Sequence, residues 1–183
     1  HKVTLVATDG RRLALTDGDV EVPAESQADF IVPTKAINEL NRLLGDKGDI
    51  EVKFTENQVS FTLLAENGFN IVIISKLVDG NYPNYRQVIP AEPQERVTLP
   101  REEFLQALRR AELMTSEKSN SVKLAFARNN LRISANTPEV GEAQENIAIN
   151  YKGKELAIAF NPTYLMDPLK ALDTDEVFFE LID

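Results

Sequence analysis

The chain repeats one pattern three times, and this internal repeat limits the folds that it can adopt. Each copy predicts a short strand, a proline at the junction and then a helix of about three turns, and the copies span 30–44, 97–111 and 158–172. Segments of alternating apolar and polar residues, which are typical of half-buried strands, follow each copy. The order of strand, helix and antiparallel strands predicts an α+β protein with few helices.

The alternating segments predict strands that pair as hairpins. They cover 50–54 and 59–63 around a turn at 56–58, 122–126 and 131–135 around a turn at 128–130, and 176–181. The opening residues, 1–6, already have the pattern of a strand interior, so we expect the chain to be part of a longer protein. Residues 90–95 hold two prolines and two glutamates, which predicts a linker between a first domain, 1–89, and a second, 96–183.

The composition excludes several classes of function. Lys and Arg total 20 against 29 Asp and Glu, which gives a net charge of −9 and excludes a uniformly basic nucleic-acid binder. There is no cysteine, and the one histidine is His1, so thiolate and internal imidazole chemistry are excluded. We expect no metal and no cofactor. No apolar run reaches the ~18 residues of a membrane span, and we expect a cytoplasmic protein.

The predicted helices separate into apolar and polar faces. Ile37, Leu40, Leu43 and Leu44 share one face of the first helix, and Phe104, Leu105, Leu108 and Ala111 share one face of the second. The polar faces carry Lys35, Arg42, Arg109 and Lys170. These cations are either ordinary exposed side chains or part of a surface that contacts phosphates without reading bases.

The sequence contains no recognisable catalytic motif. Its close carboxylate pairs, such as Asp17 with Asp19 and Asp173 with Asp175, lie in segments with the composition of exposed turns. No glycine-rich loop precedes a helix, so a phosphate-binding loop is not predicted. We therefore expect a protein that is not an enzyme.

Three segments resemble one known family. Residues 6–14 (VATDGRRLA), 75–85 (SKLVDGNYPNY) and 160–165 (FNPTYL) are similar to segments of the bacterial DNA polymerase III beta subunit, a ring-shaped sliding clamp. The three occur in the family's order, and the similarity extends over nearly the whole chain. It implies the DNA-clamp fold with helices on one face of the sheets. The first domain would be the family's middle domain, incomplete at its start, and the second its third domain, incomplete at its end.

The resemblance implies a role in DNA replication without catalysis. Family members form head-to-tail homodimers that encircle duplex DNA and make the polymerase processive during strand elongation. The helices line the hole, so Lys35, Arg42, Arg109 and Lys170 are the expected DNA-facing residues. At the dimer interface we expect Leu113 and Met114 in the apolar centre, with Arg110, Glu142 and Glu145 at its polar rim.

The resemblance also implies an apolar pocket that binds short peptide motifs of the replicative polymerase, the clamp loader and repair polymerases. Matched by motif, the pocket residues are Thr8, Gly10, Arg11, Arg12, Leu13, Pro83, Val88, Asn161 and Tyr164. For Leu13, Val88 and Tyr164, ordinary core packing is the alternative interpretation.

Two other classes of function stay open at the level of sequence. A repeat-built scaffold or adhesion protein would use its sheets for binding, and a hydrolase would need a site that the carboxylate pattern does not reveal. A ring with basic helices on its inside would exclude the first class, and the lack of any deep acidic cleft would exclude the second.

Overall fold

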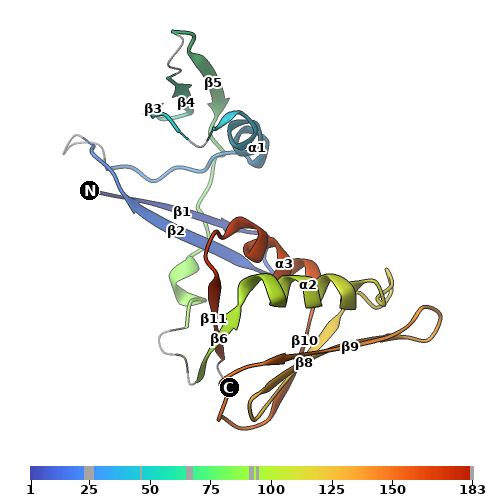
Figure 1. Ribbon diagram of the computed structural model, residues 1–183. Helices are drawn as coiled ribbons and strands as arrows, with labels where there is room; N and C mark the ends of the chain where they lie inside the picture. The colour runs from blue at the N-terminus through green and yellow to red at the C-terminus, as the bar shows by residue number, and fades with distance from the viewer. Residues whose placement is uncertain (23–26, 46, 65–67, 91–92, 94, 182–183) are drawn as a thin grey trace. The chain divides into compact units, whose positions relative to one another are not determined.

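The computed structural model describes residues 1–22, 27–45, 47–64, 68–90, 93 and 95–181 (Figure 1). The chain forms two compact units, unit 1 (His1–Arg86) and unit 2 (Gln87–Asp183), and each is described by itself. Of the predicted linker 90–95, residues 91, 92 and 94 lie outside the described residues, and Glu95 is the first residue of a strand.

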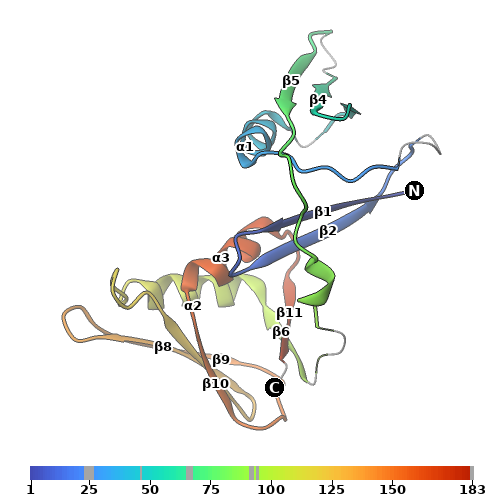
Figure 2. The same cartoon turned by 180° about the vertical axis from the view of Figure 1, so that it is seen from behind.

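Unit 2 contains two antiparallel sheets. The larger has the strand order β10-β7-β8-β9, and the smaller pairs β6 with β11. β6 and β11 lie side by side in Figures 1 and 2. The strands are β6 (Glu95–Pro100), β7 (Val122–Ala127), β8 (Asn130–Thr137), β9 (Gly141–Ala148), β10 (Leu156–Phe160) and β11 (Glu176–Leu181). The predicted hairpin at 128–130 is present, and Asn129 takes the positive φ of 59° at its turn, a conformation that asparagine tolerates.

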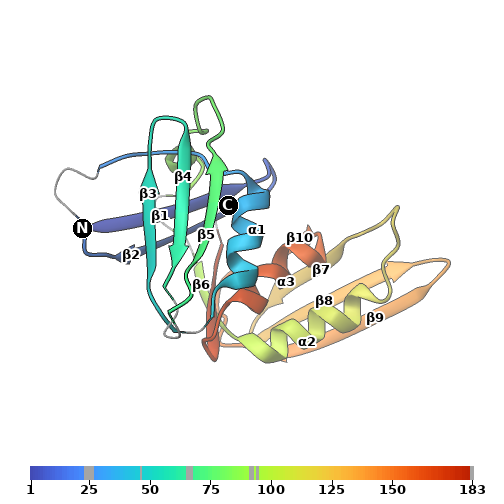
Figure 3. The same cartoon turned by 90° about the horizontal axis from the view of Figure 1, so that it is seen from above.

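Two helices cover one face of the larger sheet. α2 (Arg101–Glu112) follows β6 and packs on β7, β8 and β9, and α3 (Pro162–Ala171) packs beside α2. Figure 3 shows α2 lying along β8 and β9. The prediction that helices lie on one face of the sheet is therefore confirmed for unit 2. Among the described residues, none of the helices has the length and apolar character that crossing a membrane requires.

Helix initiation follows the prolines of the repeat. Pro100 is the N-cap residue of α2, and Pro162 is the first residue of α3, where the missing N–H has no intrahelical partner to lose. At the other end of α3, the Arg101 guanidinium donates to the carbonyl oxygens of Leu169 at 3.0 Å and Thr174 at 2.6 Å. Arg101 thus joins the start of one helix to the end of the other.

The apolar core of unit 2 lies between α2 and the sheet. Its buried aromatic and aliphatic side chains come from the inner face of α2, from α3 and from the strands β6, β7, β8, β9 and β11, and β10 adds partly buried side chains. Phe126 packs against Phe179 and Tyr151, with ring centroids 5.5 and 5.8 Å apart. The fully buried members are Val97, Leu99, Leu108, Ala111, Val122, Leu124, Leu131 and Ile133, each at 0% exposure.

Unit 1 has a smaller core. Its hairpin joins β1 (Lys2–Thr8) to β2 (Leu13–Asp19), and its sheet has the order β3-β4-β5, with α1 (Thr34–Leu43) beside β5. These strands are β3 (Ile50–Phe54), β4 (Gln58–Leu63) and β5 (Ile71–Lys76), close to the predicted bounds. A short 3-10 helix, η1 (Tyr85–Gln87), follows. The buried residues of this core are Leu40, Val59 and Phe61.

Two predictions for unit 1 are wrong. Residues 30–32 are not part of a strand. The Ile31 carbonyl accepts a hydrogen bond from the Val78 N–H at 2.9 Å, but a single backbone bond does not form a strand ladder. Ile37 and Leu44, predicted on the apolar face of the first helix, are 42% and 45% exposed rather than in the core, and Leu44 lies just beyond the end of α1. The counterpart of Ile37 in the third repeat, Met166, is 3% exposed because α3 packs beside α2. The described residues of unit 1 place no second helix beside α1.

We expect Leu124→Ala to lower the free energy of unfolding of unit 2 by about 2–5 kcal/mol, because the change leaves a cavity in a closely packed core. Leu113→Ala removes the same atoms from a side chain that is 70% exposed, and it should change the free energy of unfolding by less than about 0.5 kcal/mol. Urea denaturation followed by circular dichroism measures both. Equal losses for the two variants would contradict the position of the core.

Candidate functional site

The turn between β1 and β2 is organised by Asp9. One carboxylate oxygen accepts hydrogen bonds from the backbone N–H groups of Arg11 and Arg12, each at 3.0 Å, and the other accepts from the Arg12 side chain at 3.1 Å. The backbone N–H groups of Arg11 and Arg12 hold the pKa of the Asp9 carboxyl below its ordinary value. Gly10 has a φ of +82°, a conformation that favours glycine.

Five of the predicted pocket residues lie together at this turn. The Thr8 hydroxyl donates to the Arg12 carbonyl at 2.7 Å and accepts from the Gly10 N–H at 3.2 Å, and Leu13 begins β2 as a half-buried residue. Asp9 was not predicted as part of the site. The sequence signal that would have found it is the Asp-Gly pair, since aspartate binds the backbone of the residues that follow it in turns.

The segment that carries Pro83 is held to the same hairpin. The Tyr82 hydroxyl donates to the Val6 carbonyl of β1 at 3.1 Å. Pro83 is exposed, and its carbonyl accepts from the Tyr85 N–H at 2.7 Å, at the start of η1. Unit 1 therefore brings the predicted residues of both motifs, at 6–14 and 75–85, to one end of β1 and β2.

The remaining predicted pocket residues belong to unit 2. Asn161 is the N-cap of α3, and its side-chain oxygen accepts from the Thr163 N–H at 3.0 Å. Tyr164 lies in the first turn of α3 and is half-buried, whereas Val88 is 68% exposed. Ordinary core packing therefore does not account for Val88. The assembly of residues from unit 1 and unit 2 into one pocket stays a prediction.

The four predicted DNA-facing cations are all exposed on helices. Two of them have acidic neighbours one helical turn away: Arg42 binds Glu39 at 2.7 Å, and Lys170 lies 3.7 Å from Asp167. Among the described residues, Lys35 and Arg109 form no ion pair. Arg109 is therefore the cation of α2 whose charge is least offset by a neighbour.

The predicted interface residues of α2 and β9 divide into two groups. Arg110 and Glu145 form a two-bond ion pair within the chain, with both nitrogen–oxygen distances at 2.8 Å. The hydrogen-bonded Arg110 guanidinium lowers the pKa of the Glu145 carboxyl, and the same contact raises the pKa of Arg110. On the same strand, the Glu142 carboxylate accepts from the Asn136 amide at 3.5 Å.

The two predicted apolar interface residues behave differently. Leu113, which directly follows α2, is 70% exposed, more than any other large apolar side chain described in unit 2. Met114 is half-buried and packs against the core of unit 2. Leu113 thus presents an apolar surface to solvent, and Met114 holds the turn onto the β8–β9 hairpin.

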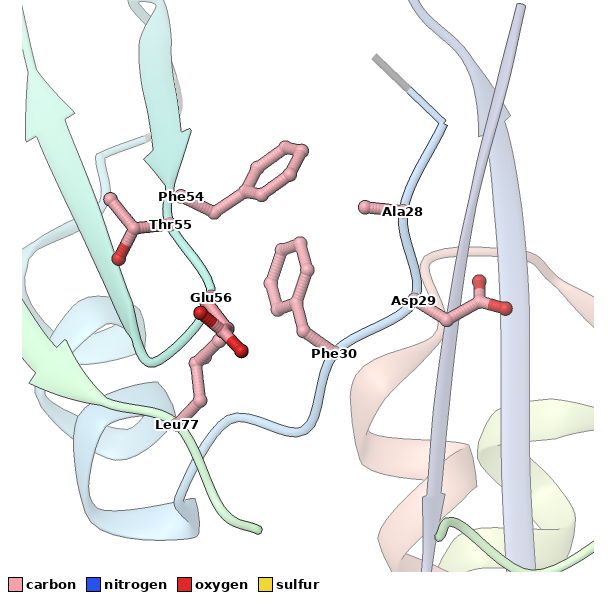
Figure 4. Close-up of a pocket in the computed structure, with 7 residues that line it drawn as sticks. All are labelled: Ala28, Asp29, Phe30, Phe54, Thr55, Glu56 and Leu77. Atoms are coloured by element: carbon pink, nitrogen blue, oxygen red, sulfur yellow. The ribbon is translucent and has the colours of Figure 1, made fainter. Parts of the chain in front are cut away.

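A shallow hollow of about 340 Å³ opens elsewhere on unit 1 (Figure 4). Figure 4 shows the Phe30 and Phe54 rings directed toward one another, with their centroids 5.1 Å apart. None of the predicted pocket residues lines it. The hollow is lined by Ala28, Asp29, Phe30, Phe54, Thr55, Glu56 and Leu77.

The described part of the chain offers no cluster of side chains for a metal ion. No group of three or more histidine, aspartate or glutamate side chains is placed there to hold a metal ion. Asp17, from one of the carboxylate pairs in the sequence, forms an exposed ion pair with Lys2 at 2.9 Å.

Two family models match the chain in succession. One describes the central domain of the DNA polymerase III beta subunit and matches residues 1–84, and the other describes its C-terminal domain and matches residues 86–183. The chain belongs to the DNA polymerase III beta subunit family. The family resemblance seen in its motifs is therefore confirmed.

Curated relatives are beta sliding clamps. The chain is 35% identical over 179 residues to that of Pseudomonas aeruginosa, a match that covers 97% of this chain and 47% of the relative. It is 37% identical over 175 residues to that of Bacillus subtilis, covering 93% of this chain and 45% of the relative. The chain thus spans about half the length of these relatives.

Solved structures of sliding clamps confirm the predicted clamp fold. The sliding clamp of Pseudomonas aeruginosa, crystallised with a ligand, has a TM-score of 0.89 and 35% identity, and the match covers 100% of this chain and 49% of that one. The clamp of Bartonella birtlesii bound to griselimycin also has a TM-score of 0.89, with 34% identity and coverage of 100% and 48%.

The Arg110–Glu145 pair predicts a pH dependence of stability. Because the folded-state pKa of Glu145 lies below its ordinary value of 4.5, its ionised form stabilises the fold above that pH. This stabilisation is lost as the pH falls through the lowered pKa. We expect the melting temperature of the parent to fall more between pH 6 and pH 3 than that of Glu145→Gln, in thermal scans by circular dichroism.

Glu142→Gln is the matched control for that experiment. It removes a carboxylate from the same strand, whose contact is with the Asn136 amide, and it should follow the parent. The same fall for Glu145→Gln and the parent would contradict the stabilising role of the pair.

Proposed function

We propose that this protein is a subunit of a processivity clamp. In its complete form it would dimerise head to tail around duplex DNA and hold the replicative polymerase there, without catalysing a reaction itself. The observation that carries the proposal is that successive halves of the chain match successive domains of the family, whose curated relatives are sliding clamps. This function would place the protein in the bacterial cytoplasm, where the chromosome is copied.

Sequence-independent contact with phosphates fits the charge of the exposed helix faces. Lys35, Arg42, Arg109 and Lys170 offer separated positive charges, and Glu39 and Asp167 partly offset two of them. Few phosphate contacts give weak binding that does not depend on base sequence. A ring that moves along DNA needs such a surface, because dense ion pairing would hold it at one position.

A peptide pocket fits the exposed apolar and turn residues of both units. The β1–β2 turn, Pro83 and the start of α3 would together border it, with Val88 and Tyr164 as apolar walls. A Leu or Phe of a partner peptide would be buried there, contributing ~1.5–3 kcal/mol per side chain. A bound ligand in the Bartonella birtlesii clamp supports the proposal that this chain also binds ligands.

A subunit interface fits the edge of the larger sheet in unit 2. β9 is an edge strand, so its outer backbone groups are available to a partner. Leu113 would form the apolar centre of the contact, and Arg110, Glu142 and Glu145 its polar rim. The partner in this proposal is a second copy of the same subunit.

The proposed DNA surface is tested by the salt dependence of binding. In the complete protein that contains this chain, Arg109→Glu should reduce the slope of log affinity against log salt concentration by about one, because one phosphate contact is lost. Fluorescence anisotropy with two unrelated duplex sequences measures this, and both should give the same reduction.

Arg132→Glu is the matched control. Arg132 lies on β8 between the buried residues Leu131 and Ile133, so its side chain is on the sheet face opposite α2. It changes the net charge equally and should leave the slope unchanged. Equal slopes for the two variants would contradict a DNA-facing role of α2.

The proposed pocket is tested at Gly10. A side chain added there enters open space, so Gly10→Leu should weaken binding of a peptide with Leu and Phe anchors at least tenfold by blocking the proposed peptide pocket. Gly68→Leu is the control, because Gly68 has nearly the same φ, +81° against +82°, and equally open surroundings. Anisotropy of a labelled peptide measures both. Equal weakening in the two variants would place the pocket elsewhere.

A further inference from the structure

The turn after α2 is held by one buried hydroxyl group. Thr137, at the end of β8, is 5% exposed and is the only polar residue buried among those that the structure describes. Its Oγ1 donates to the main-chain carbonyl of Met114 at 2.8 Å. A buried hydroxyl costs free energy unless it is hydrogen-bonded, so this bond fixes the position of the Met114 carbonyl.

The side chains of the β8–β9 hairpin become smaller toward this hydrogen bond. Along the face that α2 covers, the paired residues of β8 and β9 are Ile133 with Glu145, then Ala135 with Ala143, and finally Thr137 with Gly141. The side chains shrink toward the hairpin turn, and this allows the end of α2 to approach the sheet. A β-carbon at Gly141, which has a φ of +131°, would already lie 3.4 Å from the Met114 sulfur.

Backbone bonds complete the turn. Met114 N–H donates to the Ala111 carbonyl at 3.1 Å, and Thr115 N–H donates to the Glu112 carbonyl at 2.9 Å. Leu113 lies within these bonds in a helical conformation, with φ −59° and ψ −22°. Its neighbours on both sides are held, so its side chain is directed away from the core, at 70% exposure.

We propose that Thr137 is a positioning residue for the subunit interface: its hydroxyl holds the turn after α2 in the form that presents Leu113 to the partner subunit. The proposal rests on the clamp function proposed above and adds a residue that positions its subunit interface. A side chain fixed in its bound position before association pays less conformational entropy when the interface forms. Thr137 itself is buried, so its role in this proposal is to position Leu113 rather than to contact the partner.

The test is a double-mutant cycle on self-association, measured by sedimentation velocity of the complete protein. Thr137→Val keeps the shape of the side chain and removes the donor, and it should weaken dimerisation at least fivefold. Thr137→Ser keeps the hydroxyl and should stay within twofold of the parent. In the Leu113→Ala background, Thr137→Val should have less than half of its effect, because the side chain that it positions is absent.

A structural role alone would give the opposite result, with the effects of Thr137→Val and Leu113→Ala adding independently. Additive effects, or unchanged dimerisation in Thr137→Val while Leu113→Ala dimerises weakly, would overturn the proposal and leave the interface in place. Unchanged dimerisation in Leu113→Ala would overturn the proposed interface, and the role of Thr137 with it.

A second variant covers the case in which Thr137→Val does not fold. Thr137→Ala also removes the hydroxyl, and its smaller side chain avoids a second methyl group in the place of the oxygen. It should also weaken dimerisation at least fivefold, and less so in the Leu113→Ala background. Dimerisation equal to that of the parent would overturn the proposal.

Discussion

Burial of the apolar face of α2 against the four-stranded sheet is the interaction on which the rest of unit 2 depends. Leu108 and Ala111 are fully buried, and they meet Leu131 and Ile133 from the sheet in one core. Once this face is buried, the helical period decides where every other side chain of α2 goes. Arg109 is directed to solvent, Arg110 reaches Glu145, and the chain leaves the helix at the turn that exposes Leu113.

The two units use the same repeat with different degrees of burial. α3 packs beside α2 and shares its core, so Met166 of α3 is buried, whereas Ile37 at the matching position of α1 is 42% exposed. The hairpin of unit 1 likewise carries exposed apolar side chains, with Leu5 at 63% and Leu15 at 42%. The two repeat copies of unit 2 therefore form a larger core because their helices pack side by side.

The residues proposed to bind DNA and the partner subunit are exposed side chains outside this core. Arg42 and Arg109 lie well away from the buried stripes of their helices, and Lys170 flanks the buried stripe of α3. The proposed subunit interface lies at the edge strand β9 and at the end of α2. Three local devices shape these surfaces: Asp9 orders the β1–β2 turn, Arg110 pairs with Glu145, and the Thr137 hydroxyl holds the Met114 carbonyl. Each is a polar group with its partners satisfied, which gives an exposed side chain beside it a defined position.

The sequence by itself determined the secondary structure and the family. Strand bounds such as 50–54 and the positions of the helices follow from local alternation, helical period and proline placement, which depend on residues close in the chain. The motifs at 6–14 and 75–85 carried the family resemblance. The tertiary structure decided which apolar residues are buried: Met166 is buried, whereas Ile37 at the matching repeat position is exposed. It also decided that Arg110 and Glu145, 35 residues apart, bind one another, and that Thr137 reaches Met114. Burial and polar pairing across such separations depend on how distant elements pack, and no local pattern of residues records them.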